Sequence, residues 1–267
     1  MRHSKRNAQI LRLVREEGTC TIAGLAGQLG VSLETIRRDV RPLTEAGELL
    51  RMHGAVALPH LVREAPFERR MRENAEAKRR VAGQVIGHVL DGDTVMLDTG
   101  TTTSFVAREL LKRSGLTVVT NSSDVAHTLA TANGNTVYMA GGELNSDNGA
   151  AFGRSVLEFI SRFKVRLAII SISAIDAEIG PMDYTLREAE IARSVLASGE
   201  MKIIATDHTK FGQSALVKVC DFEDVDLLIT DQSPPKGLSD ALRLAGVETE
   251  IAGRVNSTAV ADQAAPV

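Results

Sequence analysis

The chain has 267 residues, 43% of them hydrophobic, and a net charge of −3 that is unevenly distributed. Residues 1–80 carry 16 Lys and Arg against 10 Asp and Glu, whereas residues 81–267 carry 15 against 24. A chain of this length forms one or two domains, and we expect two, of which only the basic one approaches a polyanion. The cysteines, Cys20 and Cys220, are too few for a disulfide framework, which favours a reducing compartment.

The composition also excludes several classes of protein. No stretch approaches the roughly 20 apolar residues that cross a bilayer, and Arg12 and Arg15 interrupt the apolar positions of the N-terminal segment, so no secretory leader is expected. We therefore expect a cytoplasmic protein with no membrane partner. The six histidines show no metal-ligand spacing, and the common nucleotide-binding patterns are absent. Hence we predict no metal, no cofactor and no catalytic residues.

Three short helices are predicted near the N-terminus. Apolar residues recur at helical spacing over residues 4–17 and again over 22–29, where Thr21 can cap the first turn and Gly30 can end the helix. Ser32 can cap a third helix that runs to about residue 45.

The third predicted helix has one apolar face and one cationic face. The apolar positions are Leu33, Ile36, Val40 and Leu43. Pro42 lies inside this segment and removes a backbone hydrogen bond, so we expect a bend or an early end there.

The stretch ELLRMHGAVAL, at residues 48–58, indicates two short strands around a His-Gly turn. Residues 1–58 are therefore predicted to form a winged helix-turn-helix whose third helix enters the major groove of double-stranded DNA. The candidate DNA-binding residues lie on that helix or on the wing: Ser32, Thr35, Arg37, Arg38, Arg41, Arg51 and His53. The alternative is that the arginines form an ordinary solvated surface.

After a charged linker at residues 59–75, apolar runs alternate with amphipathic helices over residues 76–255. Strands are predicted at 94–98, 116–120, 136–140, 165–173, 202–206, 227–230 and 247–251. Helices are predicted at 76–90, 104–113, 122–132, 154–163, 185–198 and 236–245. This alternation is typical of a Rossmann-like α/β domain, in which a mostly parallel sheet is covered on both faces and ligands bind at the carboxyl ends of the strands.

The segment MLDTGTTTSFVAREL, at residues 96–110, joins a predicted strand to a helix. Its loop contains Asp98, Thr99, Gly100, Thr101, Thr102 and Thr103. We expect Gly100 to permit a tight turn, so that the following amides and threonine hydroxyls bind a phosphate monoester. An ordinary loop whose threonines cap the helix is the alternative. An aspartic protease is disfavoured because the chain has no second motif of this kind.

Other polar residues follow the remaining predicted strands. Asn121, Gly142, Asp176 and Lys210 are candidate effector-binding residues, with Lys210 supplying charge to the phosphate and Asp176 accepting from hydroxyl groups. Each of them alone is more typical of a turn or a helix cap, and it is their shared position after strands that favours a binding site.

Several of these motifs together resemble the DeoR family of transcriptional regulators. TIAGLAGQLGVSLETIRRDVRPLTEAGELLRMHGAV is similar to that family's winged helix-turn-helix. PFERRMRENAEAK, LDTGTTT, VVTNSSDVA, AGGELNSDNGAAFG and DHTKFG are similar to its linker and effector domain. Within the family the resemblance is greatest to the repressors of glycerol-3-phosphate regulons.

The resemblance implies a repressor that forms a homo-oligomer, either a dimer or a tetramer, and binds operator DNA until a phosphorylated sugar or polyol binds. It also implies a sugar-phosphate-sensing domain similar in fold to ribose-5-phosphate isomerase, with phosphate contacts at Thr99–Thr103. The rival interpretation is an isomerase-like enzyme with an accessory DNA-binding head, in which Glu188 or Glu190 acts as a base near Asp176. The glycine-rich lysine loop that resembles an isomerase active site is absent, and PMDY stands in its place.

Overall fold

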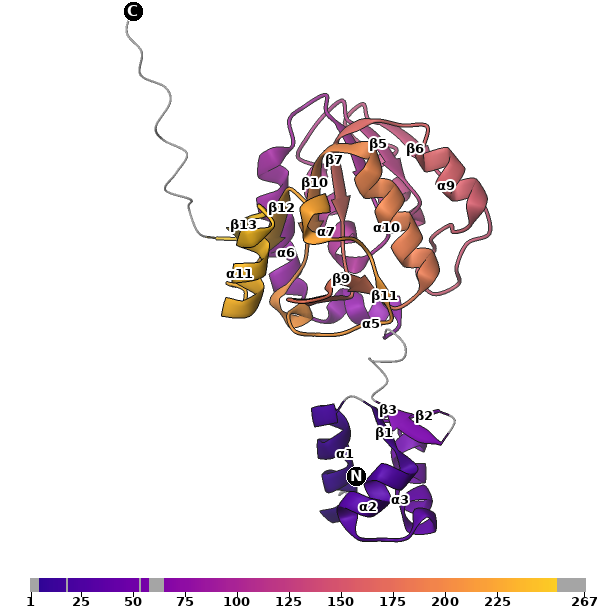
Figure 1. The fold of residues 1–267 in the computed structure, drawn as a ribbon. Helices are drawn as coiled ribbons and strands as arrows, with labels where there is room; N and C mark the ends of the chain where they lie inside the picture. The colour runs from indigo at the N-terminus through magenta and orange to yellow at the C-terminus, as the bar shows by residue number, and fades with distance from the viewer. Residues whose placement is uncertain (1–4, 18, 53, 58–64, 254–267) are drawn as a thin grey trace, which may run out of the picture. The chain divides into compact units, whose positions relative to one another are not determined.

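The structure is a computed structural model of the chain and describes residues 5–17, 19–52, 54–57 and 65–253. The chain divides into two compact units, Met1–Ala65 and Pro66–Val267 (Figure 1). Among the described residues, the first unit has one cluster of buried hydrophobic residues and the second has two. Within the described ranges, no helix has the length and apolar content needed to span a membrane.

The first unit contains a helix-turn-helix and a small antiparallel sheet. Its described elements are α1 (Lys5–Glu17), β1 (Thr19–Thr21), α2 (Ile22–Leu29), α3 (Leu33–Glu45), β2 (Leu50–Met52) and β3 (Ala55–Ala57). Strand β3 pairs with both β1 and β2. The three predicted helices and the two wing strands are confirmed, and β1 is a third strand that sequence analysis did not predict.

The ends of α2 and α3 have the predicted caps. The Thr21 hydroxyl accepts a hydrogen bond from Gly24 N at 2.9 Å, and Gly30 ends α2 with a left-handed φ of 64°. The Ser32 hydroxyl accepts from Thr35 N at 3.2 Å at the start of α3. These bonds satisfy backbone groups that the helix ends would leave unpaired.

The early end predicted at Pro42 is wrong, because α3 continues through the proline to Glu45. The proline removes only one backbone hydrogen bond. The next residue, Leu43, is buried together with Ile36 and Val40 in the core of this unit. Packing of this face therefore holds the last turn of the helix in place.

Of the four residues on the predicted apolar face of α3, Ile36, Val40 and Leu43 are buried and Leu33 is not. This side chain belongs to the first turn and is 46% exposed, whereas the buried residues of the helix begin at Ile36. A large apolar side chain thus lies on the surface at the start of α3.

The second unit is an α/β domain. Its helices are α5 (Phe67–Arg72), α6 (Ala75–Val85), η1 (Ile86–His88), α7 (Thr101–Leu110), α8 (Ser123–Leu129), α9 (Arg154–Ile160), α10 (Leu186–Ser198), η2 (His208–Lys210), η3 (Phe222–Asp224) and α11 (Lys236–Leu244). Its strands are β4 (Thr94–Leu97), β5 (Thr117–Thr120), β6 (Thr136–Met139), β7 (Val165–Ile170), β8 (Ala174–Asp176), β9 (Gly180–Asp183), β10 (Gly199–Ala205), β11 (Val217–Lys218), β12 (Leu227–Thr230) and β13 (Glu248–Ile251).

Seven of these strands form one parallel sheet in the order β13-β12-β10-β7-β4-β5-β6. All seven predicted strands are present in it, which confirms the predicted parallel α/β domain. Sequence analysis did not predict the separate sheet of β8, β9 and β11, whose strands pair antiparallel.

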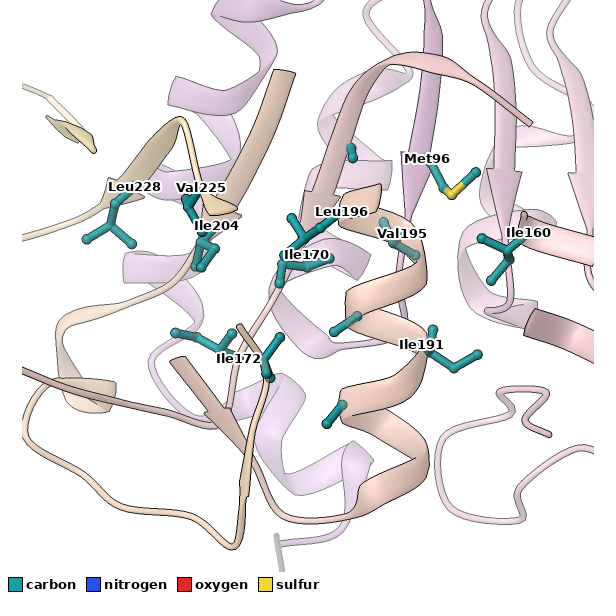
Figure 2. Packing of buried hydrophobic residues seen from close by; sticks show 14 of the residues in the cluster. Met96, Ile160, Ile170, Ile172, Ile191, Val195, Leu196, Ile204, Val225 and Leu228 are labelled. Atoms are coloured by element: carbon teal, nitrogen blue, oxygen red, sulfur yellow. The ribbon is translucent and has the colours of Figure 1, made fainter. Parts of the chain in front are cut away.

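Both faces of the parallel sheet are covered, because successive residues of a strand point to opposite sides. Along β4, Val95 and Leu97 join the cluster that includes α6, α7 and α8, whereas Met96 joins the cluster that includes α9, α10 and α11. Figure 2 shows Leu196 of α10 beside Ile170 of β7 in the second of these clusters. Burial on both faces explains why these strands appear in the sequence as continuous apolar runs.

Candidate functional site

Polar residues follow the carboxyl ends of the central strands. Asp98 follows β4, Asn121 follows β5 and Ser171 follows β7. Because β4 lies between β5 and β7 and all three run in the same direction, these residues are neighbours along one edge of the sheet. Ligands of open α/β sheets bind at this edge.

The loop that follows β4 is tied to both neighbouring strands. On the β7 side, Ser171 N donates to Asp98 Oδ2 at 3.1 Å. On the β5 side, Thr99 Oγ1 donates to Asn121 Oδ1 at 3.1 Å, and Asn121 Nδ2 donates to the Ala151 carbonyl at 2.9 Å. The structure thus brings the predicted loop and Asn121 together.

Helix α7 begins directly after this loop, at Thr101 rather than at the predicted residue 104. Its cap residue is Gly100, which offers no side chain, and the first backbone bond of the helix runs from Ser104 N to Gly100 O at 3.0 Å. The amides of Thr101, Thr102 and Thr103 therefore lie in the first turn, at the positive end of the helix dipole. The start of this ten-residue helix suits a phosphate monoester.

Gly100 is needed for space and not for a tight turn. Its φ of −175° is an extended conformation that any residue adopts, so the expected reason for this glycine is wrong. A Cβ atom on Gly100 would lie 1.9 Å from Ser171 Oγ and 3.1 Å from Ser171 Cβ. The side chain of Ser171 therefore occupies the space beside the α-carbon of Gly100.

The hydroxyl of Thr103 is used inside the loop itself. It donates to the carbonyl oxygens of Gly100 and Asp98, at 3.1 Å and 3.3 Å. Of the three threonine hydroxyls expected to meet a ligand, this one instead holds the loop in shape.

Asp98 is a buried carboxyl group whose pKa is raised to about 7. Burial is the main cause; the hydrogen bond from Ser171 N opposes the rise, and the nearby Glu188 adds to it. Asp98 Oδ1 is buried and has no hydrogen-bond partner within the described part of the chain. Below about pH 7 the neutral group does not repel an anion at the start of α7.

The raised pKa of Asp98 predicts that the contribution of this group to the stability of the folded state is lost between about pH 4 and pH 7. In the unfolded chain the group ionises near pH 3.8, whereas in the folded chain it keeps its proton until about pH 7. The folded state then binds more protons, so the free energy of unfolding falls as pH rises through this window. The loss is at most roughly 1.4 kcal/mol for each pH unit.

Urea titrations of the wild type and Asp98→Asn between pH 4 and pH 8 measure this contribution. The difference in unfolding free energy between the two proteins should change across the window and level off above pH 7, because asparagine does not titrate. A difference that is constant with pH would contradict the assignment.

A second group of charged residues comes from α6 and from the segments that follow β10 and β12. Only part of this group was predicted from the sequence. Lys78 of α6 is buried, and its Nζ donates to the carbonyl oxygens of Arg70 and Glu73 at 2.5 Å and 2.9 Å. Burial lowers its pKa to about 8; Asp207 opposes this change, and Lys210 adds to it. Lys78 thus lies near the predicted residue Lys210.

Sequence analysis did not identify Lys78, although a signal was present. Lys78 shares the buried face of α6 with Val81, Ala82 and Val85, at helical spacing. A lysine within an otherwise apolar helix face is seldom buried without a partner.

Asp231, which follows β12, anchors this group to α6. Its buried carboxylate accepts from His208 N at 2.8 Å, from His208 Nδ1 at 3.0 Å and from Arg80 Nη2 at 3.0 Å. Burial alone would raise the pKa of Asp231, but these partners outweigh it and the pKa is lowered. An ionised Asp231 therefore fixes η2, which carries Lys210, against α6.

The other two predicted effector residues are Asp176, the last residue of β8, and Gly142. Asp176 Oδ1 accepts from Glu178 N at 2.8 Å and from Ile179 N at 3.0 Å, so this oxygen shapes the turn between β8 and β9. Gly142 is exposed in the loop after β6. No group of three or more potential metal-ligating residues occurs in the described ranges.

The predicted arginines of the first unit are exposed. Arg37, Arg38 and Arg41 lie on α3, and Arg51 lies on β2. Arg37 is 3.6 Å from Glu34, and Arg41 is 2.9 Å from Glu45. Such exposed ion pairs contribute little free energy. The two glutamates therefore compete only weakly with a phosphate group for these arginines.

The polar residues predicted beside these arginines have local roles. The hydroxyls of Ser32 and Thr35 lie 2.9 Å apart at the start of α3, where Ser32 is also the cap. His53 lies outside the described residues.

Comparison with known proteins decides the family. A model of the DeoR-like helix-turn-helix domain matches residues 6–61, and a model of the DeoR C terminal sensor domain matches residues 73–232. The chain belongs to the DeoR family. The glycerol-3-phosphate regulon repressor of Escherichia coli strain K12 is 34% identical over 251 residues, which cover 94% of this chain and 100% of that protein.

Two other DeoR-type relatives match nearly as much of the chain. The HTH-type transcriptional repressor CsqR of Escherichia coli strain K12 is 34% identical over 91% of this chain and 93% of its own length. The transcriptional repressor AccR of Agrobacterium fabrum is 35% identical over 85% of this chain and 88% of its own. This DeoR-family chain is therefore a DNA-binding transcriptional repressor and not an enzyme.

Solved structures show a more distant likeness. Ribose 5-phosphate isomerase from Plasmodium falciparum is similar to 50% of this chain over 51% of its own, with a TM-score of 0.36 and 18% identity. The eIF2B beta chain from Chaetomium thermophilum is similar to 83% of this chain over 70% of its own, with a TM-score of 0.42 and 15% identity.

Proposed function

We propose that this DeoR-family repressor binds the operator of a sugar or glycerol catabolic operon and leaves it when a phosphorylated sugar or polyol binds. The start of α7 carries this proposal, because its amides have no capping side chain and lie beside Asp98, whose pKa of about 7 keeps the group mostly neutral below that pH. Glycerol-3-phosphate is the first candidate effector. Relatives named for the glycerol-3-phosphate regulon, from Escherichia coli and Haemophilus influenzae, are 34% and 33% identical to the chain.

In the proposed complex the phosphoryl group accepts hydrogen bonds from the first-turn amides of α7 and from the Thr102 hydroxyl. Lys210 supplies positive charge from η2, the short helix that follows β10. The hydroxyl groups of the effector are proposed to meet Asp98, Thr99, Asn121, Asp176 and the backbone of Gly142. Binding of this kind favours release only if the effector prefers the state that does not bind DNA.

On the DNA side, α3 is proposed to lie in the major groove. Arg37 and Arg38 are the base-reading candidates, since an arginine can donate two hydrogen bonds to guanine. Ser32, Thr35, Arg41, Arg51 and His53 are proposed to contact the phosphate backbone. We also propose that the repressor acts in the cytoplasm as a homo-oligomer, because helix-turn-helix repressors commonly bind two half-sites.

Helix α5 is the proposed link between effector and DNA, because among the described residues it is the first helix that follows β3 in chain order and both of its ends are held by the sensor unit. Phe67 N, at its start, donates to both carboxylate oxygens of Asp147 at 3.2 Å. The carbonyls near its end accept from Lys78, which lies near Asp207 and Lys210. The first contact comes from the loop after β6 and the second from α6.

The test measures effector binding and operator release separately. Glycerol-3-phosphate should raise the melting temperature of the full-length protein, since a ligand of the folded state stabilises it, and should release a promoter duplex in a gel-shift titration. In Thr102→Val the shape of the side chain is kept and the hydroxyl is lost, so the melting shift should shrink and release should need at least roughly tenfold more effector, as for a lost hydrogen bond to a charged group.

The matched control is Thr128→Val, because the Thr128 hydroxyl donates to the Asp124 carbonyl within α8, away from the loop after β4. Both variants should bind the duplex like the wild type without effector. If triose, pentose, hexose and polyol phosphates all left the melting temperature of the wild type unchanged, the proposed function would be wrong.

A further inference from the structure

Leu33 is a large apolar side chain that lies outside the hydrophobic core of the first unit. It is 46% exposed, and it is the first residue of α3, directly after the cap Ser32. The buried residues of this helix begin three positions later, at Ile36. Leu33 therefore faces solvent at the tip of the second helix of the helix-turn-helix.

The surroundings of Leu33 favour DNA as its partner. Arg37 lies one helical turn away, on the same side of α3, and Arg38 and Arg41 are also exposed. Glu34, which is also exposed and lies 3.6 Å from Arg37, is outnumbered by these three arginines, so the surface complements a polyanion. In helix-turn-helix proteins the first residues of the second helix reach the base edges of the major groove.

The major groove offers one apolar group, the C5-methyl of thymine, which leucine can cover. We infer that Leu33 reads thymine in the operator by packing against its C5-methyl group, while Arg37 beside it makes polar contacts. Leu33 is then a specificity-determining residue of a DNA interface whose other members carry charge or hydroxyl groups.

The experiment removes that methyl group and nothing else. The full-length protein selects a high-affinity duplex from a random library, and each thymine of this duplex is then replaced in turn by deoxyuridine. For the wild type we expect binding to weaken about fourfold at one or more positions, the effect of exposing one buried methyl group. In Leu33→Ala, thymine and deoxyuridine at that position should bind equally well.

Two further variants guard against a change in folding. Leu33→Met keeps an apolar side chain and should still distinguish the two bases. Leu244→Ala removes a 91% exposed leucine from α11, in the other unit, and should behave as the wild type. The melting temperature of each variant is measured alongside.

The inference is overturned if the wild type binds every deoxyuridine duplex as well as the parent, or if Leu33→Ala still distinguishes the two bases. If Leu33→Ala keeps this discrimination, the sedimentation of the free protein shows what Leu33 does instead. A change in sedimentation would mean that Leu33 covers a second copy of the chain and not DNA. None of these outcomes depends on the identity of the effector.

Discussion

Gly100→Ala is expected to abolish most of the response to glycerol-3-phosphate while leaving operator binding in the absence of effector unchanged. The added Cβ atom would lie 1.9 Å from Ser171 Oγ, so either Ser171 or the start of α7 must move. Because Ser171 N also holds Asp98 at 3.1 Å, movement on either side disturbs the proposed phosphate contacts. Overpacking of this kind costs about 1–3 kcal/mol, which corresponds to roughly 5- to 150-fold in effector concentration.

The same contact supplies a rescue experiment. Ser171→Gly removes the clashing hydroxyl and Cβ, so the double variant Gly100→Ala/Ser171→Gly should recover part of the response. Gly237→Ala is the control, since a Cβ atom on this helical glycine of α11 would meet no atom within 4 Å. A Gly100→Ala protein that is released at the wild-type concentration of effector would show that the ligand binds elsewhere.

The contrast between Gly100 and its predicted role shows what sequence reasoning can and cannot reach. The loop was predicted because a strand, a glycine and three threonines are contiguous in the sequence. The actual requirement for glycine comes from Ser171, which follows a different strand, β7. Contacts between residues far apart in sequence leave no local pattern, so a short motif can predict a site without revealing why each residue is needed.

The same distinction applies to the strands. The strands of the parallel sheet are buried on both faces and appear as apolar runs, so all seven were predicted. Strand β9, with the sequence GPMD, contains a glycine and a proline and pairs with the two-residue strand β11 across about 35 positions of the chain. Neither strand has a periodic pattern. Their pairing is stabilised by contacts between distant segments and could not be predicted from local sequence.

The DNA-binding unit follows the same rule. Caps such as Thr21 and Ser32 act within three residues, so the sequence predicts them well. Leu33 fits the apolar period of α3 but lies at its end, beyond the buried residues. Periodicity gives the direction of a side chain around the helix axis, and it does not show how far along the axis the neighbouring elements extend.

Asp147→Ala is expected to leave both effector binding and operator binding in place while weakening the effect of one on the other. Asp147 accepts from Phe67 N at the start of α5, and Arg70 lies 3.9 Å from the same carboxylate. Loss of such a cap costs about 1 kcal/mol. The variant therefore lacks this stabilisation of the contact between α5 and the loop after β6. The ratio of operator affinities without and with glycerol-3-phosphate should therefore fall roughly fivefold.

A graded series distinguishes capping from charge. Asp147→Asn keeps an oxygen that can accept from Phe67 N but loses the attraction to Arg70, so its coupling should lie between those of the wild type and Asp147→Ala. Asp240→Ala removes an aspartate that pairs with Arg243 within α11, at 3.3 Å, and serves as the control. The melting shift with effector should be the same in all four proteins, because none of these aspartates lies in the proposed phosphate site.

The two measurements together decide whether α5 carries the signal. If Asp147→Ala lost the melting shift as well, Asp147 would be part of the effector site and not of the link. If it kept both the shift and the full affinity ratio, the signal would pass from the loop after β4 to the DNA-binding unit without the contact at the start of α5. The remaining contact, from Lys78 to the carbonyls of Arg70 and Glu73, would then be the connection to remove next.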